Sequence, residues 1–439
     1  MIVPISIDMT NVLYKLNQRE KNRFITKKFI PNTSKIIGYA PAPPLSPVLS
    51  WAQIGQLIDD GFRCDIDASG NRIVIGRVQL GSASTHVYDW DGTNWVQLGN
   101  TITGTYTFGI NDYTVGASSL AISADGIWVA IGASREPFDQ SDASVVTVFK
   151  WDGTNWILYT VLEGLGGPFD YFGSDITFNS LGGNDALLVI GATGGDDNYN
   201  GTMYGYGLEE QNNGLFWVKQ FGAAQTPTAV GDIGMRGRAS VSGGGKVIFG
   251  NPSYIEQDDN LQVGRVYFRN FSGGPLTVID GENDGDKFGD SVSINEAGTR
   301  CAIMAKLAIV SEVKVYDLDG INWIQVGNTI QVPRGSAGIS GIPVQVELNA
   351  AGDRLVICSS YNWDPESATP PQVVIKTFKL VDNNWEQFGS DILGADNVDW
   401  NTTDMKVNAA GDRIVFRSFG NNFVPEPGSD VRVYSLESQ

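Results

Sequence analysis

The sequence predicts an all-β fold, a seven-bladed β-propeller of four-stranded antiparallel blades. Three observations support this prediction: an apolar pair that recurs seven times, a repeated tryptophan motif, and two ends of the chain that complement each other. The 439 residues include 53 glycines and 18 prolines. This composition suits many short strands joined by many turns, and a chain of this length exceeds the usual size of a single core.

Each repeat opens with two apolar residues separated by one position, the period of a strand with one buried face. The pairs are Cys64/Ile66, Leu120/Ile122, Ile176/Phe178, Ala239/Val241, Val292/Ile294, Val346/Leu348 and Met405/Val407. Seven pairs predict seven sheets, each beginning with one such strand.

A tight turn containing glycine follows each pair, because hairpin turns need a residue that adopts positive φ without steric cost. The turn glycines are Gly70, Gly126, Gly298, Gly352 and Gly411, with glycine-rich variants near Gly183 and Gly245. A second apolar strand follows, such as Arg72 to Ile75. The third strand leads into an Asp-Gly turn, as at Trp90-Asp-Gly92.

The fourth strand of each repeat carries a tryptophan, often as Trp-x-x-x-Gly. Its members are Trp95, Trp156, Trp217, Trp323 and Trp385, with Leu276 in the fourth copy. Trp51 has no repeat in front of it, and the seventh repeat ends at Gln439 without a fourth strand. We therefore expect a strand at about 51–59 to complete the last blade beside Val431 to Tyr434 and so close the ring.

Residues 1–48 do not follow the repeat and are expected to form a basic arm in front of a propeller at 49–439. Residues 1–50 hold seven basic and two acidic side chains, which leaves 23 basic and 47 acidic residues in the rest of the chain. An amphipathic helix is expected from Thr10, followed by a stiff proline-rich spacer at 41–47. The candidate anchor residues are Val12, Leu13, Leu16, Arg19, Arg23, Lys27 and Lys28.

The acidic body argues against a nucleic-acid-binding surface, since phosphate binding requires clustered Lys and Arg. DNA binding by the arm through Lys27 and Lys28 is a minor hypothesis. No stretch predicts a membrane span or a signal peptide. The three cysteines are too far apart in the sequence and too apolar in context for a disulfide framework, so buried free thiols are expected.

No catalytic motif is present, and no cofactor or metal is expected. The single histidine, His86, lies on a predicted third strand without matched partners, which favours a structural role. Ser123 to Trp128 superficially resembles the Asp-box of sialidases but has different spacing. An enzyme is therefore not the expected class.

The segments Phe288-Gly-Asp-Ser-Val-Ser-Ile294 and Phe172-Gly-Ser-Asp-Ile176, with Ile-Gly-Ala endings at 131–133 and 190–192, resemble FG-GAP repeats, the blades of integrin α-subunit propellers. The Trp-Asp-Gly-x-x-Trp hairpins are similar to those of repeat proteins from marine bacteria, phages and large DNA viruses. The resemblance covers about 51–439 and implies the propeller fold. Calcium loops occur in such blades, but Asp196 to Gly201, the nearest approach here, lacks their alternation and final acid.

In a blade of antiparallel strands, the second-to-third and fourth-to-first connections lie at one end of the ring. Here these loops hold the variable length: Ser134 to Ala143, Thr193 to Gly201, Asn251 to Gly264, Ser359 to Gln372, and Ser418 to Ser429. Aromatic and acidic side chains in such loops suit protein or sugar ligands. The candidate partner-binding residues are Phe138, Tyr199, Tyr254, Tyr361, Trp363, Phe423, Asp197, Asp258 and Asp364.

These features favour a non-enzymatic structural or attachment protein of a virus particle, located in the virion. In that hypothesis the arm docks into other virion proteins of the capsid or tail, and the propeller is an exposed platform for a host protein or glycan. The alternative is an extracellular or cell-surface adhesion module that binds glycan or protein through the loop face.

Overall fold

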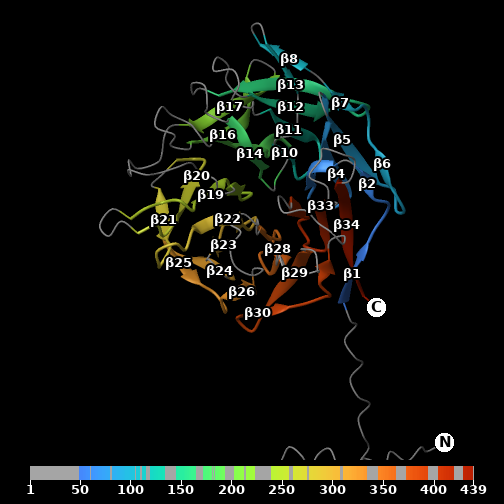
Figure 1. Cartoon of the computed structure of the whole chain (residues 1–439). Helices are drawn as coiled ribbons and strands as arrows, with labels where there is room; N and C mark the ends of the chain where they lie inside the picture. The colour runs from blue at the N-terminus through green and yellow to red at the C-terminus, as the bar shows by residue number, and fades with distance from the viewer. Residues whose placement is uncertain are drawn as a thin grey trace, which may run out of the picture. The chain divides into compact units, whose positions relative to one another are not determined.

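The computed structural model is a ring of seven antiparallel sheets, the seven-bladed β-propeller that the sequence predicts (Figure 1). It describes residues 49–59, 61–79, 82–103, 105–108, 111–114, 119–133, 145–164, 172–179, 181, 183–192, 202–211, 214–222, 239–256, 261–273, 276–306, 310–333, 345–361, 372–393, 404–419 and 429–438. All of them belong to the unit Val48–Gln439. The arm and its candidate anchor residues lie outside the described residues.

The apolar pairs lie on the innermost strands, as predicted. These strands define blades 1 to 7 in order: β3 (Gly61–Ile66), β10 (Ser119–Ile122), β14 (Phe172–Phe178), β18 (Ala239–Val241), β22 (Phe288–Ile294), β27 (Gln345–Leu348) and β32 (Met405–Val407). The second strands are β4 (Arg72–Gln79), β11 (Trp128–Ala133), β15 (Leu187–Ala192), β19 (Lys246–Asn251), β23 (Arg300–Lys306), β28 (Arg354–Tyr361) and β33 (Arg413–Phe419).

The outer half of each blade completes the sheet. The third strands are β5 (Ser82–Trp90), β12 (Val145–Trp151), β16 (Thr202–Gln211), β20 (Arg265–Asn270), β24 (Val310–Asp319), β29 (Gln372–Val381) and β34 (Ser429–Ser438). The outermost strands are β6 (Trp95–Gln97), β13 (Trp156–Glu163), β17 (Gly214–Gly222), β21 (Thr277–Asp280), β25 (Asn322–Gln325), β30 (Asn384–Gln387) and, in blade 7, β1 (Leu49–Gln53).

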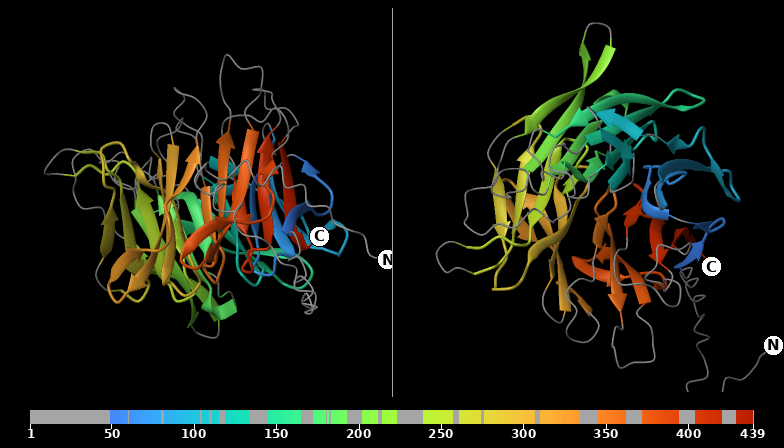
Figure 2. Two further views of the ribbon diagram at one scale, coloured as in Figure 1. Left: turned by 90° about the horizontal axis from the view of Figure 1, so that it is seen from below. Right: turned by 45° about the horizontal axis from the view of Figure 1, so that its top comes forward.

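Three short elements lie outside this scheme: the hairpin of β8 (Thr105–Phe108) and β9 (Asn111–Thr114), and one 3-10 turn, η1 (Gly183–Asp185). The side view in Figure 2 shows the blade strands running from one end of the ring to the other. No helix among the described residues has the length and apolar character that a membrane crossing requires.

The ring closes where the sequence predicts. β1 pairs antiparallel with β34, with Trp51 opposite Leu436 and Gln53 opposite Tyr434. A second short strand, β2 (Ile58–Asp59), pairs with β34 through Ile58 and Val431. The first strand of the ring therefore completes the last blade, and the open edge that either end would leave is removed.

Four outermost strands are split in two by a wide bulge. The second parts are β2, β7 (Ile102–Thr103), β26 (Ile330–Pro333) and β31 (Ile392–Leu393). The bulge contains the glycine of Trp-x-x-x-Gly, for example Gly327 at φ +75°. A Cβ at Gly327 would lie 2.8 Å from Cδ1 of Trp385 in the next blade. Glycine is therefore required both for the backbone conformation and for the close approach of the neighbouring indole.

A second contact between successive blades comes from a cation at the start of the second strand. The side chain donates a hydrogen bond to the carbonyl of a turn glycine in the next blade. The pairs are Arg72 with Gly126, Lys246 with Gly298, Arg300 with Gly352, Arg354 with Gly411, and Arg413 with Gly70. The last pair joins blade 7 to blade 1. The seam, which is the contact between these two blades, therefore has the same hydrogen bond as the contacts between other successive blades.

The three cysteines belong to the core. Cys64, Cys301 and Cys358 are buried thiols that form no disulfide, as predicted. Burial raises the pKa of Cys64 and of Cys301 well above the ordinary thiol value. These thiols pack as small apolar side chains, because the reactive thiolate is disfavoured without water.

Candidate functional site

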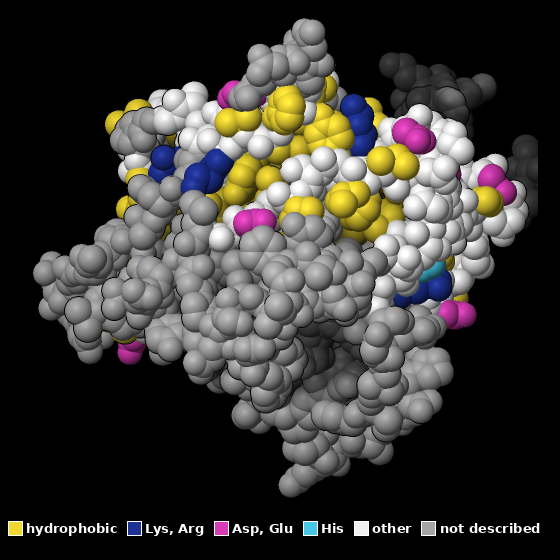
Figure 3. All heavy atoms as spheres, turned by 90° about the horizontal axis from the view of Figure 1, so that it is seen from above, with side chains coloured by type: hydrophobic (Ala, Val, Ile, Leu, Met, Phe, Trp, Pro, Cys, Tyr) yellow, Lys and Arg dark blue, Asp and Glu magenta, His cyan; other side chains and the backbone are white. Residues whose placement is uncertain are grey.

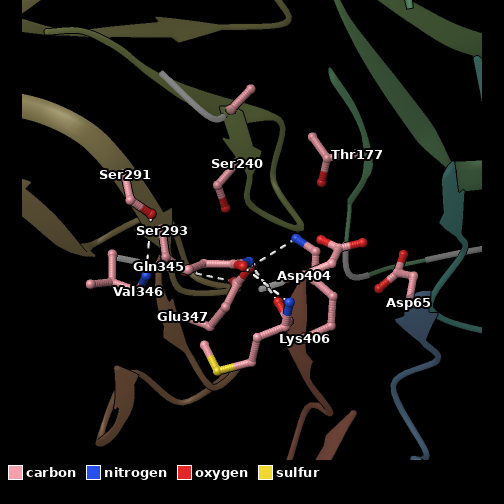
Figure 4. Close-up of polar contacts among 12 residues, drawn as sticks. Asp65, Thr177, Ser240, Ser291, Ser293, Gln345, Val346, Glu347, Asp404 and Lys406 are labelled. Atoms are coloured by element: carbon pink, nitrogen blue, oxygen red, sulfur yellow. Dashed lines mark hydrogen bonds and ion pairs between the residues drawn. The ribbon is translucent and has the colours of Figure 1, made fainter. Parts of the chain in front are cut away.

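The polar positions of the innermost strands line the central channel. On each of these strands one residue lies between the two members of the apolar pair. Because side chains alternate along a strand, this residue points to the face opposite the apolar pair. These residues are Asp65, Ala121, Thr177, Ser240, Ser293, Glu347 and Lys406, from blade 1 to blade 7. All of them except Ala121 line a cavity of about 140 Å³ (Figure 4).

The charged residues of this set are neighbours in the ring, in blades 6, 7 and 1. The ammonium of Lys406 lies 2.8 Å from Oε1 of Glu347. The same carboxylate accepts hydrogen bonds from Nε2 of Gln345 at 3.1 Å and from the hydroxyl of Ser293 at 3.4 Å. Figure 4 shows these side chains converging from adjacent strands. Blades 3 to 5 contribute the hydroxyl-bearing residues Thr177, Ser240 and Ser293 at the same position, and Glu296 of blade 5 also lines the cavity.

Asp65 is the carboxylate whose protonation responds to pH near neutrality. Its oxygens accept hydrogen bonds from the backbone amides of Ile66 at 2.8 Å and Ile122 at 2.9 Å. Burial raises the pKa of Asp65 from 3.8 to about 7, against the lowering effects of Lys406 and of the two amides, while Asp404 contributes a further rise. Desolvation is the largest of these effects because burial disfavours the charged carboxylate.

A second charged group lies at the seam between blades 7 and 1. Asp404 is buried, and its Oδ2 accepts a hydrogen bond from the amide of Cys64 at 3.0 Å. Arg417 is 1% exposed. Burial and the like charge of Arg63 lower the pKa of Arg417 to about 9, whereas Asp404 favours its charged form. The hydrogen bond from Cys64 to Asp404 links blade 1 to blade 7 from inside the ring.

The polar side chains also satisfy the free edges of the innermost strands. Such a strand pairs on one side only, so amides on its other side need acceptors from elsewhere. A side chain of one blade supplies the acceptor for the innermost strand of the next. The pairs are Asp65 with Ile122, Asp175 with Ala239, Ser240 with Ile294, Ser291 with Val346, Ser293 with Leu348, Gln345 with Met405 and Asp404 with Cys64.

The channel offers hydrogen-bonding groups to a small polar molecule, and many of these groups are already engaged within the ring. The hydroxyls of Ser240 and Ser293 accept hydrogen bonds from backbone amides, and Lys406 forms an ion pair with Glu347. In the described part of the chain, no three His, Cys, Asp or Glu side chains are grouped so that they could hold a metal ion. His86 lies apart on β5, where Nε2 is 3.0 Å from the Ser84 hydroxyl, and burial lowers its pKa.

Two of the loop-face residues that the sequence singles out have described backbones. Tyr254 is not the exposed aromatic that a loop position suggests: it is 7% exposed, and the guanidinium of Arg265 lies 3.6 Å from its ring centre. The loop folds back onto blade 4, so Tyr254 packs instead of facing a partner. Tyr361 ends strand β28. Phe138, Tyr199, Trp363, Phe423, Asp197, Asp258 and Asp364 lie outside the described residues.

The channel residues were not among the predicted site residues, although the sequence carries a signal for them. The apolar pairs locate the innermost strands, and the residue inside each pair must face the other way. Asp65, Glu347 and Lys406 are the three charged residues at these positions. Their convergence in one cavity follows only from the closed ring, in which blades 6, 7 and 1 become neighbours.

No protein-family model matches the sequence, and no curated protein does. Solved structures similar to this chain, one of them named as a propeller, have low sequence identity. The Dos1 propeller is 12% identical, with 89% of this chain and 94% of that chain covered and a TM-score of 0.45. The WD40 domain of Toxoplasma gondii coronin is 12% identical, with 90% and 88% covered and a TM-score of 0.49. The Kuenenia stuttgartiensis hydrazine synthase is 10% identical, with 88% and 98% covered and a TM-score of 0.46. The names cover unrelated functions, so these comparisons concern the fold alone.

Proposed function

We propose that this chain is a non-enzymatic structural or attachment protein of a virus particle. In this proposal residues 1–48 dock into other proteins of the capsid or tail, and the propeller is an exposed interaction platform. The observation that carries the proposal is that the ring is complete without the arm. β1 begins at Leu49, so all seven blades are complete without residues 1–48.

The charge distribution supports separate roles for the two parts. Residues 1–50 hold seven basic and two acidic side chains, whereas the remaining chain holds 23 basic and 47 acidic ones. A basic segment whose sequence predicts a helix with one apolar face suits an acidic assembly partner. The ring itself is held by side-chain contacts at the seam and between interior blades, which makes it a rigid support for ligand-binding loops.

The test compares the full chain with the chain that begins at Leu49. Both are tagged and produced during infection of the source host, and particles are then purified by density gradient. We expect the full chain in the particle fraction, and a truncated chain that stays folded, by circular dichroism, but is absent from particles. Equal incorporation of both chains, or absence of both from particles, would refute the proposal.

The adhesion alternative makes a different prediction for the same two chains. A glycan- or protein-binding module would retain ligand binding after loss of residues 1–48, because its site would lie on the ring. Binding of both chains to the same glycans on an array, without incorporation of either chain into particles, would favour that alternative.

A further inference from the structure

The cavity in the central channel reaches the end of the ring where the turns between the first and second strands lie. Residues of these turns line it together with the polar residues of the innermost strands. In six blades one turn residue takes part in backbone hydrogen bonds of 2.9 to 3.1 Å between neighbouring blades. The amides donate to carbonyls in the order Gly243 to Glu296, Glu296 to Ala350, Ala350 to Ala409, Ala409 to Ala68 and Ala68 to Ala124. We call these six residues the mouth of the cavity.

The mouth is open because its side chains are small. Four of its residues are alanines that line the cavity and are partly exposed, and a fifth is Gly243. Glu296 is the one long side chain of the mouth, and it both lines the cavity and is exposed to solvent. The polar residues behind the mouth are partly exposed as well: Asp65, Thr177, Ser240, Glu347 and Lys406. The cavity is therefore accessible to solutes in the surrounding water.

The charged residues behind the mouth stand at a position where other blades have serine. The serines of blades 4 and 5 at this position each accept an amide from the innermost strand of the next blade. Asp65 does the same for the amide of Ile122 in blade 2. It also accepts the amide of Ile66, because Lys406 of blade 7 offers no acceptor there. Since serine satisfies these strand edges in two blades, the edges do not require charged side chains at this position in blades 6, 7 and 1.

The lining of the cavity is acidic. Among the described residues that line it, four carry carboxylates and one carries an ammonium: Asp65, Asp67, Glu296, Glu347 and Lys406. Lys406 forms its ion pair with Glu347, and Asp67 accepts hydrogen bonds within its own turn. Asp65 and Glu296 add negative charge that no ammonium of the lining balances. On the side of the ring shown in Figure 3, by contrast, Lys and Arg side chains are interspersed with Asp and Glu. The cavity therefore attracts cations and repels anions.

The size of the cavity and its hydroxyl groups limit the kind of cation that fits. The volume of about 140 Å³ is close to the roughly 150 Å³ of an engineered protein cavity that holds benzene, so the occupant has about six non-hydrogen atoms. Figure 4 shows the hydroxyls of Thr177 and Ser240 directed toward the space that Glu347 also enters. These hydroxyls suit an occupant with hydrogen-bonding groups of its own. A bare metal ion is disfavoured, since no three His, Cys, Asp or Glu side chains of the described residues are grouped to hold one.

We propose that this cavity binds a small organic cation that carries a primary ammonium and hydroxyl groups on neighbouring carbons. The ammonium pairs with the carboxylate of Asp65, and the hydroxyls exchange hydrogen bonds with Thr177 and Ser240. Glu296 attracts the cation at the mouth. The proposal goes beyond a virion function and does not depend on it, because every residue of this site belongs to the ring and none to residues 1–48.

The probes are serinol and glycerol, which have the same number of non-hydrogen atoms and differ by one ammonium in place of one hydroxyl. Saturation-transfer NMR with the full chain measures the Kd of each probe. The buffer is at about pH 8, because burial raises the pKa of Asp65 to about 7 and its carboxylate must be ionised. Serinol is expected to bind in the millimolar range, and glycerol and the anion lactate at least tenfold more weakly. Asp65→Asn is expected to reduce serinol binding to the level of glycerol, since it removes the charge but keeps an oxygen for the amide of Ile122.

The matched control is Asp175→Asn. Asp175 accepts the amide of Ala239 as Asp65 accepts that of Ile122, but it is not among the residues that line the cavity. This variant is expected to bind serinol as the unmodified chain does. Lys406→Met is expected to strengthen serinol binding, because it removes the ammonium that repels the ligand, whereas a lysine with a purely structural role would give no gain. Circular dichroism checks that all variants fold. The proposal is overturned by absence of serinol binding at tens of millimolar, by equal binding of glycerol or lactate, by undiminished binding in Asp65→Asn, by an equal loss in Asp175→Asn, or by no gain in Lys406→Met.

Discussion

Replacing Trp51 with alanine is expected to destabilise the whole ring, because Trp51 belongs to the strand that joins the two ends of the propeller. Trp51 is 7% exposed, and its Nε1 donates a hydrogen bond to Oγ1 of Thr377 at 3.1 Å. A Cβ at Gly389 of blade 6 would lie 3.0 Å from this same nitrogen. The indole therefore fills a tight site between blade 6 and blade 7.

The magnitude follows from the burial of this side chain. Truncation of a buried tryptophan to alanine costs about 3–5 kcal/mol through lost transfer free energy and the cavity that remains. About 1 kcal/mol of that comes from the hydrogen bond to Thr377. Trp51→Phe keeps most of the apolar contact and should lose roughly 1–2 kcal/mol. Net stabilities are only about 5–15 kcal/mol, so the alanine variant should have a clearly lower unfolding midpoint.

The assay is urea unfolding followed by far-UV circular dichroism, with the slope compared between variants. The matched control is Trp385→Ala in blade 6, because Trp385 is 3% exposed and its Nε1 donates to the carbonyl of Val326 at 3.3 Å. Equal losses are expected, within about 1 kcal/mol. A loss below about 0.5 kcal/mol for Trp51→Ala, typical of surface sites, beside a large loss for Trp385→Ala would refute the closure.

Three further predictions concern the channel and the joints. Asp65→Asn should abolish a pH dependence of the unfolding free energy. The pKa of Asp65 is raised from 3.8 to about 7 in the folded chain. Between these pH values the folded chain therefore keeps a proton that the unfolded chain has lost. The unfolding free energy of the unmodified chain should therefore fall as pH rises from about 4 to 7, by at most about 4 kcal/mol at 1.36 kcal/mol per pKa unit, and an identical profile for the variant would contradict this. Arg300→Met should lower the unfolding free energy by about 2 kcal/mol in urea, since it removes two hydrogen bonds to the Asp317 carboxylate and one to the Gly352 carbonyl of the next blade. An unchanged unfolding midpoint would contradict a stabilising role for these contacts. Gly327→Ala should cost at least about 1 kcal/mol more than Gly92→Ala, because both glycines have positive φ but only the first would place a Cβ against Trp385; equal costs would show that backbone strain alone requires the glycine.

The architecture could be predicted because its determinants are local and repeated. The alternation around Met405 and Val407, like that of the other pairs, fixes which strand lies innermost, and the glycine turns fix the hairpins. The place of Trp51 could be predicted by counting strands. An extra strand at the start of the ring and a missing strand in the last blade leave no open edge only if the two pair. The wide bulge in the outermost strand was not predicted, although the glycine of Trp-x-x-x-Gly was visible, because its cause is the indole of the next blade.

The candidate sites were harder to predict because they depend on contacts between distant residues. Glu347 and Lys406 are 59 positions apart, and their ion pair exists only once blades 6 and 7 are adjacent. Tyr254 illustrates the opposite error: residue type and loop position suggested exposure, but Arg265 on the following strand covers the ring. Side-chain exposure in a loop is set by how the loop folds back, which sequence periodicity does not encode.

Departures from the repeat show which contacts between blades the ring can replace. A position that serves only the ring should keep the same chemistry in every blade, as the glycines at Gly298 and Gly352 do. Trp128 and Leu187 replace the Arg or Lys of the other blades, and Thr160 replaces the glycine after the outermost tryptophan. Nε1 of Trp217 has no hydrogen-bond partner among the described residues, whereas Trp156 and Trp385 donate to carbonyls of the preceding blades. At the joint between blades 2 and 3, packing of Trp128 against Tyr159 and Trp217 takes the place of those hydrogen bonds. The ring therefore does not need the same contact between every pair of successive blades.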